Sequence, residues 1–239
     1  MKPRICVSLA AKTPSEIPAM IRRAEEAEAD LIEIRLDHLS TDLSDAARFF
    51  ENLVKEASIP MIATNRQYEQ GGLRPQAEDS RTQILIQAAE AGFQYVDVEL
   101  TTAKLESLVE KIKSYGVKPI ISFHDFKKTP SFQDMEKIVG SEINVGAEIC
   151  KLITTACNTE DNLKCLLLTR KISRLAKIVC FAMGRKGLIS RVLSPIFGGY
   201  FTFASLSNGA KTAPGQLSID DLKSLYVKLG VYDEDLRKN

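Results

Sequence analysis

The chain has 239 residues, of which 44% are hydrophobic and 26% charged, as in a globular protein with one large domain or two small ones. The net charge of +1 and the 7% aromatic content, without tryptophan, argue against nucleic-acid binding, which needs a basic field and stacking platforms. The apolar run near the N-terminus spans only about seven residues, too short for a membrane span, so we expect a soluble, cytoplasmic protein.

Apolar or β-branched runs alternate along the chain with segments of helical periodicity. Eight runs predict strands, at Ile5–Leu9, Leu31–Leu36, Pro60–Thr64, Tyr95–Leu100, Lys118–Phe123, Ala147–Ile153, Ile178–Met183 and Tyr200–Ser205. The gaps predict helices, at Ser15–Ala29, Ser44–Ala57, Ser80–Ala91, Ala103–Tyr115, Phe132–Val139, Glu160–Leu175, Leu188–Ile196 and Ile219–Leu229. We expect Ser15 to cap the first helix, Asp45 and Asp161 to lie near helix starts, and Gly92 and Gly116 to end helices.

Strands that alternate with helices pair in parallel through right-handed crossovers. No Gly-x-Gly-x-x-Gly loop follows the first run, which disfavours a doubly wound dinucleotide-binding sheet. We therefore predict an α/β fold, a (β/α)8 TIM barrel, that forms a single catalytic domain over residues 1–239.

The cysteines and histidines limit the kinds of metal site and acid-base catalyst that the chain can form. Five cysteines form no CxxC pair, so we expect free core thiols, at Cys6, Cys150, Cys157, Cys165 and Cys180. Only two histidines occur, His38 and His124, so a zinc site of three histidines is excluded. A histidine acid-base catalyst must be one of these two.

Catalytic side chains of a barrel come from the carboxyl ends of its strands. Polar residues close or follow each predicted strand, at Ser8, Glu33, Arg35, Asp37, Arg66, Glu99, His124, Asp125, Lys151, Arg191 and the segment Lys211–Gln216. Glu33 and Arg35 alternate on one face and are expected to point inward, whereas for Asp37 and His38 we favour a structural network at the rim.

Lys151 lies within an apolar strand, where desolvation would turn its ammonium into a nucleophilic amine. The alternative is that it ends its strand and extends to solvent. His124 follows the neighbouring strand, so the two side chains can act on one substrate. Nearby arginines would lower the pKa of Lys151 and attract an anionic small molecule such as a carboxylate.

These residues resemble the type I 3-dehydroquinate dehydratases over essentially the whole chain. Five patches carry the resemblance: Glu33 to His38, Ser122 to Phe126 with Thr129-Pro130, Lys151, Met183 with Gly187 to Arg191, and Ala213 to Gln216. The resemblance implies a (β/α)8 barrel that converts 3-dehydroquinate to 3-dehydroshikimate in the shikimate pathway, without metal or organic cofactor. The family is often dimeric, which implies a possible homodimer.

The resemblance also implies roles for single residues. Lys151 would form an imine with the substrate ketone, and His124 would transfer protons. Arg191 would bind the substrate carboxylate, assisted in substrate binding by Ser8, Glu33, Arg35, Arg66, Thr212 and Gln216. Phe181, Met183 and Phe203 would form an apolar wall, and Lys211–Gln216 a lid.

The chain departs from the family at Gln70, where the family usually has a glutamate that binds the catalytic histidine. Glu69 is a possible substitute through a shifted loop. Thr212 stands where serine is commoner. Two other functions remain open from the residues alone: another lysine-imine barrel such as a class I aldolase, and a catalytically silent barrel that binds a small carboxylate.

Overall fold

The computed structural model of the protein describes residues 2–207, 209, 213 and 215–232. All eight predicted strands are present, with boundaries shifted by a few residues. They are β1 (Ile5–Leu9), β2 (Leu31–Arg35), β3 (Met61–Thr64), β4 (Tyr95–Glu99), β5 (Lys118–His124), β6 (Ile149–Thr155), β7 (Lys177–Met183) and β8 (Thr202–Ser205).

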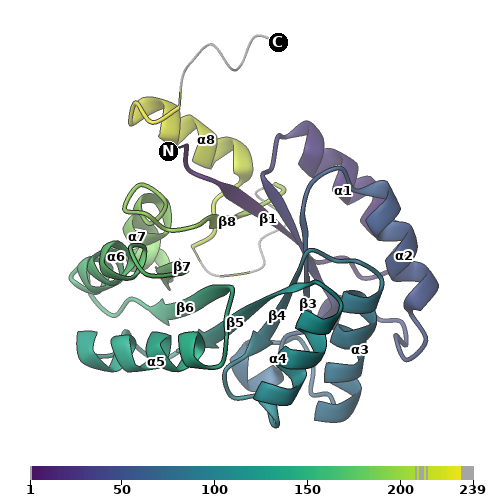
Figure 1. Cartoon of the computed structure of the whole chain (residues 1–239). Helices are drawn as coiled ribbons and strands as arrows, with labels where there is room; N and C mark the ends of the chain where they lie inside the picture. The colour runs from purple at the N-terminus through teal and green to yellow at the C-terminus, as the bar shows by residue number, and fades with distance from the viewer. Residues whose placement is uncertain (1, 208, 210–212, 214, 233–239) are drawn as a thin grey trace.

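The strands form one parallel sheet in the order β7-β6-β5-β4-β3-β2-β1-β8. The two ends of the sheet meet where the backbone N–H of Tyr200, just before β8, donates to the carbonyl of Ile178 in β7 at 2.7 Å. Figure 1 shows the strands at the centre of the molecule and the helices around them. The predicted (β/α)8 barrel is confirmed as a nearly closed barrel of parallel strands.

One helix follows each strand. The helices are α1 (Ile17–Glu26), α2 (Ala47–Glu56), α3 (Glu78–Glu90), α4 (Leu105–Ser114), α5 (Phe132–Asn144), α6 (Asp161–Ile172), α7 (Leu188–Leu193) and α8 (Ile219–Lys228). Short 3-10 turns add η1 (Pro14–Glu16), η2 (Leu36–His38), η3 (Tyr68–Gln70) and η4 (Arg185–Gly187). In the part of the chain that the structure describes, no helix has both the length and the apolar character that a membrane span requires.

The predicted helix ends are partly confirmed. Gly92 and Gly116 follow α3 and α4 with φ of +100° and +77°, values that glycine adopts without strain. Asp161 is the first residue of α6, as expected. Ser15 is wrong as a cap, because it lies inside η1, and prolines rather than a capping side chain begin both η1 and α1. Asp45 lies in the turn before α2, outside its first helical turn.

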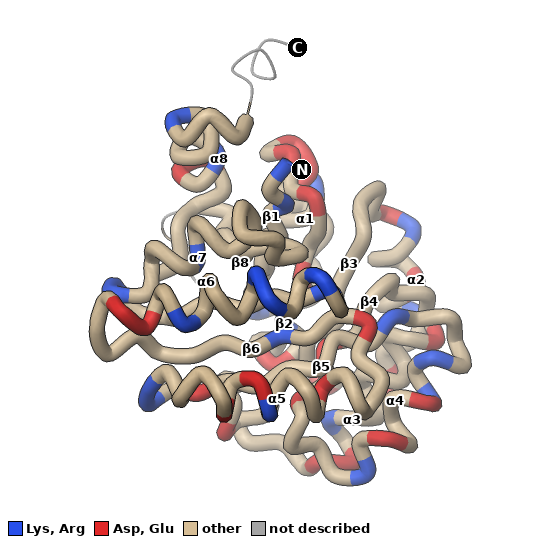
Figure 2. The backbone as a smooth tube through the Cα atoms, turned by 60° about the vertical axis from the view of Figure 1, so that its left-hand side comes forward, with Lys and Arg blue, Asp and Glu red and all other residues tan. Residues whose placement is uncertain are grey.

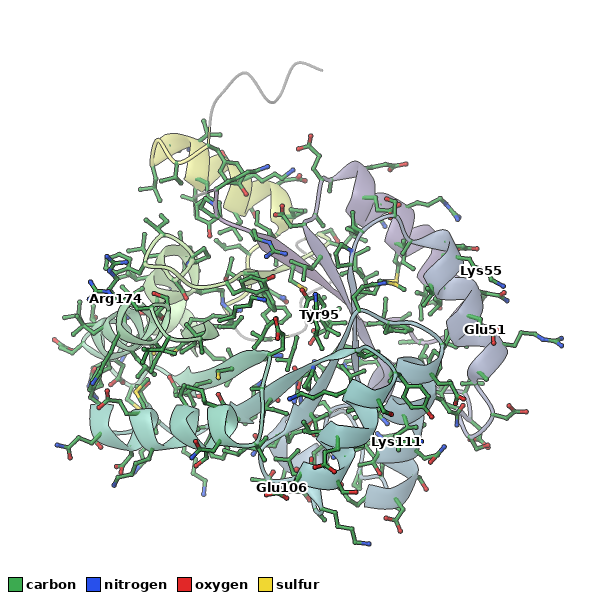
Figure 3. The ribbon with its side chains drawn as sticks, in the orientation of Figure 1. Glu51, Lys55, Tyr95, Glu106, Lys111 and Arg174 are labelled. Atoms are coloured by element: carbon green, nitrogen blue, oxygen red, sulfur yellow. The ribbon has the colours of Figure 1, made fainter. Side chains whose placement is uncertain are left out.

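The barrel interior is divided into two halves. Its lower half, toward the amino ends of the strands, is filled by buried apolar side chains, including Cys6, Leu31, Ile62, Tyr95, Ile120, Ile149, Val179 and Phe201. Figure 3 shows Tyr95 near the centre of the ring, whereas the labelled charged side chains extend outward from the helices and the loop after α6. The polar side chains of the strands therefore gather in the other half, which faces the carboxyl ends.

The five cysteines are free, and four of them are buried, as predicted. Cys157 is the exception, because it lies exposed in the loop after β6 rather than in the core. Its thiol contacts the carbonyl of Lys127 at 3.5 Å.

Candidate active site

Lys151 lies at the centre of the polar half of the barrel. β6 places it opposite Ser122 of β5, and its side chain is only 4% exposed. Its Nζ lies 2.7 Å from Oδ2 of Asp97 and 3.5 Å from Oε1 of Glu33, and 4.5 Å above the ring of Phe203. The alternative that Lys151 extends to solvent is therefore wrong, since its amine is buried against two carboxylates.

Asp97 is the main partner of Lys151 and was not among the site residues predicted from the sequence. It lies on the inner face of β4, and its Oδ2 also receives Nη2 of Arg66 at 2.8 Å. The hydroxyl of Ser122 donates to its other oxygen at 2.6 Å. Burial alone would raise the pKa of Asp97, but Arg66 and Lys151 hold it far below its usual value. The period-2 spacing of Tyr95, Asp97 and Glu99 is the signal that points to this residue.

Both terminal nitrogens of Arg66 bind protein groups. Its Nη1 lies 2.8 Å from Oε1 of Glu99 and 2.7 Å from the Ser122 hydroxyl, while Nη2 binds Asp97. Burial lowers the pKa of Arg66, but the two carboxylates outweigh that effect and raise it overall. Arg81 of α3 pairs with the other oxygen of Glu99 at 2.6 Å. This network of Arg66, Glu99 and Arg81 fixes the position of the Asp97 carboxylate.

Glu33 is held in a similar way on β2. Its carboxylate accepts hydrogen bonds from Ser8 at 2.5 Å and from Thr64 at 2.9 Å. Burial raises the pKa of Glu33, but Lys151 and Arg35 lower it below the usual value. Ser8, opposite Glu33 on the neighbouring strand β1, therefore orients the carboxylate of Glu33.

Arg35 is held by Asp37. The chain turns at η2, so Asp37 folds back and does not continue the strand alternation. It accepts a two-pronged pair of hydrogen bonds from Arg35 at 2.9 and 2.7 Å. It also accepts from the backbone N–H of Leu73 at 3.1 Å, and His38 lies 3.8 Å away. The predicted structural role of Asp37 and His38 is confirmed, although not through a shared strand face.

His124 ends β5 and faces the same space as Lys151. Burial lowers its pKa well below the usual value, and the positive charges of Arg66 and Lys151 lower it further. Its ring stacks on Phe126, with centroids 6.1 Å apart. Within the described residues its buried Nδ1 has no hydrogen-bond partner. The imidazole is therefore neutral near pH 7 and able to accept a proton.

Gln70 contacts His124, but through the backbone. Its Oε1 accepts from the His124 N–H at 2.7 Å. Gly71, with φ of +89°, ends η3 and allows the chain to pass Phe126, because a Cβ at Gly71 would lie 2.4 Å from that ring. Glu69 is exposed and does not take the place of Gln70. Gln70 thus positions the strand end that carries His124.

Arg191 reaches the site from α7. It is buried, and its guanidinium lies 4.3 Å from the ring centre of Phe181, which packs edge-on against Phe203 at 6.5 Å. Burial lowers its pKa to about 10, so it stays charged at neutral pH. A cation beside an apolar wall suits an anionic ligand with a hydrophobic ring.

These side chains surround a pocket of about 580 Å³ that opens at the carboxyl ends of the strands. Its lining is Glu33, Arg35, Arg66, Gln70, Gly71, His124, Phe126, Lys151, Ile153, Phe181, Met183, Arg191, Phe203, Ala213 and Gln216. Most of the predicted site residues thus converge. Ser8 does not line the pocket. Of the predicted lid Lys211–Gln216, residues 211, 212 and 214, and with them Thr212, lie outside the described residues.

A buried amine, a neutral imidazole and three arginines in one pocket suit covalent chemistry on the carbonyl of an anionic substrate. No group of three or more His, Cys, Asp or Glu side chains among the described residues is arranged to hold a metal ion.

Comparisons with known proteins agree with this arrangement. The sequence model of the family described as type I 3-dehydroquinase matches residues 5–233. The 3-dehydroquinate dehydratase of Methanosarcina acetivorans is 34% identical over 210 residues, covering 85% of this chain and 87% of that protein. That of Dehalococcoides mccartyi is 35% identical over 214 residues, covering 87% and 92%. The crystal structure of the Geobacillus kaustophilus 3-dehydroquinate dehydratase superposes with a TM-score of 0.90 at 25% identity, covering 98% of this chain and 93% of that one.

Proposed function

Because the chain belongs to the type I 3-dehydroquinase family of hydro-lyases, we propose that it dehydrates 3-dehydroquinate to 3-dehydroshikimate through an imine on Lys151. Dehydration of 3-dehydroquinate, a step of the shikimate pathway, follows from membership in the family. Membership in this family argues against the two alternative functions, a class I aldolase and a catalytically silent barrel that binds a small carboxylate. The observation that supports the imine is the buried Lys151 amine, which shares its pocket with a neutral His124.

The first step is the attack of Lys151 on the ring ketone. The ammonium must first lose a proton, and the lowered pKa values of Asp97 and Glu33 make both carboxylates poor acceptors. His124 is the neutral base in the same pocket, so it takes this proton and returns it as the carbinolamine loses water. The resulting iminium carries a positive charge at the atom where the ammonium carried it. Asp97 and Glu33 therefore stabilise both the resting ammonium and the iminium.

The second step is removal of a proton from the carbon next to the iminium. The electron pair of the broken C–H bond moves toward nitrogen, giving a neutral enamine, while His124 becomes an imidazolium. One positive charge thus leaves Lys151 as another appears on His124, so the pocket keeps its total charge. His124 then donates this proton to the departing hydroxyl, one water is lost, and hydrolysis of the iminium releases the product.

Substrate binding is divided among several side chains. We assign the substrate carboxylate to Arg191 and, from the resemblance to the family, also to Gln216 and Thr212. Arg35 and Glu33 line the pocket and are held by Asp37 and Ser8, so both are oriented for substrate hydroxyls. Arg66 contributes mainly by holding Asp97, and Ser8 by holding Glu33. We further propose that the enzyme works in the cytoplasm on this small anion and binds no nucleic acid, in keeping with its net charge of +1.

Reductive trapping tests the imine directly. With 3-dehydroquinate and sodium borohydride, the chain should gain a reduced adduct on Lys151, located by peptide mass spectrometry. Lys151→Ala should abolish both the adduct and the appearance of the conjugated enone absorbance. Lys186→Ala, which removes an amine outside the pocket, serves as the control and should leave both readouts unchanged. Turnover that survives Lys151→Ala would refute the mechanism.

A further inference from the structure

Arg191 lies on a helix that is too short to hold its own position. α7 has six residues, so its backbone closes only about two hydrogen bonds of its own, and helices of this length are unstable alone. Contacts with neighbouring elements must therefore fix it, and Figure 1 and Figure 2 both show α6 beside α7. The carbonyl of Arg191 accepts from the hydroxyl of Thr202 in β8 at 2.8 Å, and that of Val192 from Tyr226 in α8 at 2.9 Å. These bonds hold the second half of α7.

The start of α7 has no capping side chain of its own. Its N-cap residue is Gly187, and a Cβ there would lie 2.3 Å from the carbonyl oxygen of Ala182 in β7. Only glycine fits this close approach to the strand, so the serine, threonine, aspartate or asparagine that usually caps a helix is excluded. The N–H groups of the first turn have no partner within the helix, and they need one from another element.

Asn162 of α6 is that partner. It is only 1% exposed, and its Oδ1 accepts from the N–H of Ser190, the third residue of α7, at 2.8 Å. A conventional N-cap side chain binds the second or third N–H of its helix in the same way. Nδ2 of Asn162 donates to the carbonyl of Lys186 in η4 at 2.8 Å and to that of Thr159 at 2.9 Å. One buried amide therefore joins α6 to the turn before α7 and to its first turn, one residue from Arg191.

We propose that Asn162 is a positioning residue for substrate binding, which sets where Arg191 meets the substrate carboxylate. This role presupposes that Arg191 binds the carboxylate, as proposed for the reaction. A guanidinium binds a carboxylate through two parallel hydrogen bonds, which depend on the orientation of both groups. Asn162 does not line the pocket, whereas Lys151 and His124 reach it from β6 and β5. Its loss should therefore weaken substrate binding and leave the chemical steps nearly unchanged.

Steady-state kinetics of the full chain separates binding from chemistry. Asn162→Ala removes all three hydrogen bonds, so it should raise KM for 3-dehydroquinate by about tenfold or more, with kcat within about threefold of wild type. Asn162→Asp keeps the acceptor for the Ser190 N–H but loses the donor, so its KM should lie between those of the wild type and Asn162→Ala. Circular dichroism reports whether each variant is folded, and the KM of Asn162→Asp decides the test if Asn162→Ala does not fold.

Asn158→Ala is the matched control. Asn158 is exposed just before α6, and its Oδ1 accepts from the Asp161 N–H at 3.0 Å. Its substitution removes an asparagine that caps α6 but none of the three bonds that Asn162 makes. Asn158→Ala should therefore leave KM at the wild-type value.

A double-mutant cycle shows whether Asn162 acts through Arg191. Arg191→Ala alone should raise KM, and adding Asn162→Ala should then change kcat/KM by less than about threefold, because no guanidinium remains to be positioned. A further loss of about tenfold in that background overturns the proposal, and so do folded Asn162 variants whose KM equals that of the wild type. If Arg191→Ala raises KM and the Asn162 variants do not, only the role of Asn162 is wrong. If Arg191→Ala itself leaves KM unchanged, the assignment of the carboxylate is wrong, and the role of Asn162 falls with it.

Discussion

The two faces of β6 treat buried ionisable groups in opposite ways. Lys151 points into the barrel, where Asp97 and Glu33 compensate its charge. Glu142 of α5 lies against the outer face of the same strand, near Cys150, and is fully buried. Neither of its carboxylate oxygens has a hydrogen-bond partner of normal geometry among the described residues. Contacts with the Lys151 backbone N–H and the Cys150 thiol lower its pKa, but burial outweighs them and raises the pKa well above the usual value. On the inner face of β6 the buried groups stay charged because each has a partner of opposite charge. On the outer face the buried carboxyl of Glu142 is protonated and neutral.

Substitutions on the two faces should therefore change the free energy of unfolding in opposite directions. Removing one partner from a buried, paired group leaves an uncompensated charge, which typically costs about 3–5 kcal/mol. A buried carboxyl without a well-formed hydrogen bond already carries a desolvation cost of about 1–3 kcal/mol, which its removal would relieve. Substitutions on the inner face should therefore damage the protein, and a substitution of Glu142 should stabilise it.

Asp97→Asn should give the largest effect. An amide keeps the shape of Asp97 but leaves Lys151 and Arg66 as two neighbouring cations without their shared carboxylate. We expect kcat/KM to fall by at least about 100-fold, which corresponds to about 2.7 kcal/mol. Steady-state kinetics with 3-dehydroquinate measures this. Asp45→Asn, at an exposed turn, is the control, and activity of Asp97→Asn within threefold of wild type would contradict the assigned role.

Glu142→Met tests the outer face. A carboxyl whose pKa is raised on folding stays protonated in the native state while the unfolded chain releases its proton, so it reduces stability increasingly as the pH rises above the unfolded pKa. We expect Glu142→Met to increase the free energy of unfolding by about 1–3 kcal/mol at pH 8, and by less near pH 4.5. Urea unfolding at both pH values measures the difference.

The control for this experiment is Glu51→Met, because Glu51 extends from the outer surface of α2 (Figure 3) and should change stability by no more than about 0.5 kcal/mol. Glu142→Gln separates two contributions, since it removes the ionisable proton but leaves a polar group to bury. A loss of stability in Glu142→Met would show that the contacts with Cys150 and the Lys151 backbone outweigh the cost of burying the carboxyl, and that the contrast between the two faces is wrong.

The sequence predicted the barrel because apolar runs and helical periodicity are local properties of the chain. It also singled out Lys151 as an amine within an apolar strand, His124 at the end of the neighbouring strand and Arg191 in the helix after the seventh strand, and all three line one pocket. It missed Asp97, whose importance depends on the register that sets it against Lys151 across two strands. The role of Ser8 in orienting Glu33 also depends on strand register and could not be predicted from the sequence. The helix predicted at Phe132–Val139 ended too early, because α5 continues to Asn144, and Glu142 therefore went unnoticed.

Gln70→Glu tests whether the pocket tolerates another negative charge. Of the three substitutions it should change the protein least. A carboxylate can still accept the His124 backbone N–H, so the strand end should stay in place. The cations Arg35, Arg66 and Lys151 surround His124, and the added negative charge would offset part of their effect and raise the lowered pKa of the imidazole.

The free enzyme needs a neutral His124, so kcat/KM declines as the pH falls through the pKa of that group. Gln70→Glu should therefore keep turnover near pH 7 at or above the wild-type value, while the acid limb of the kcat/KM profile moves to higher pH by about one unit. Glu69→Gln, which changes the exposed neighbour, should leave the limb in place. A tenfold loss of turnover in Gln70→Glu would mean that the amide itself is needed, because the carboxylate preserves the hydrogen bond to the backbone and changes only the charge.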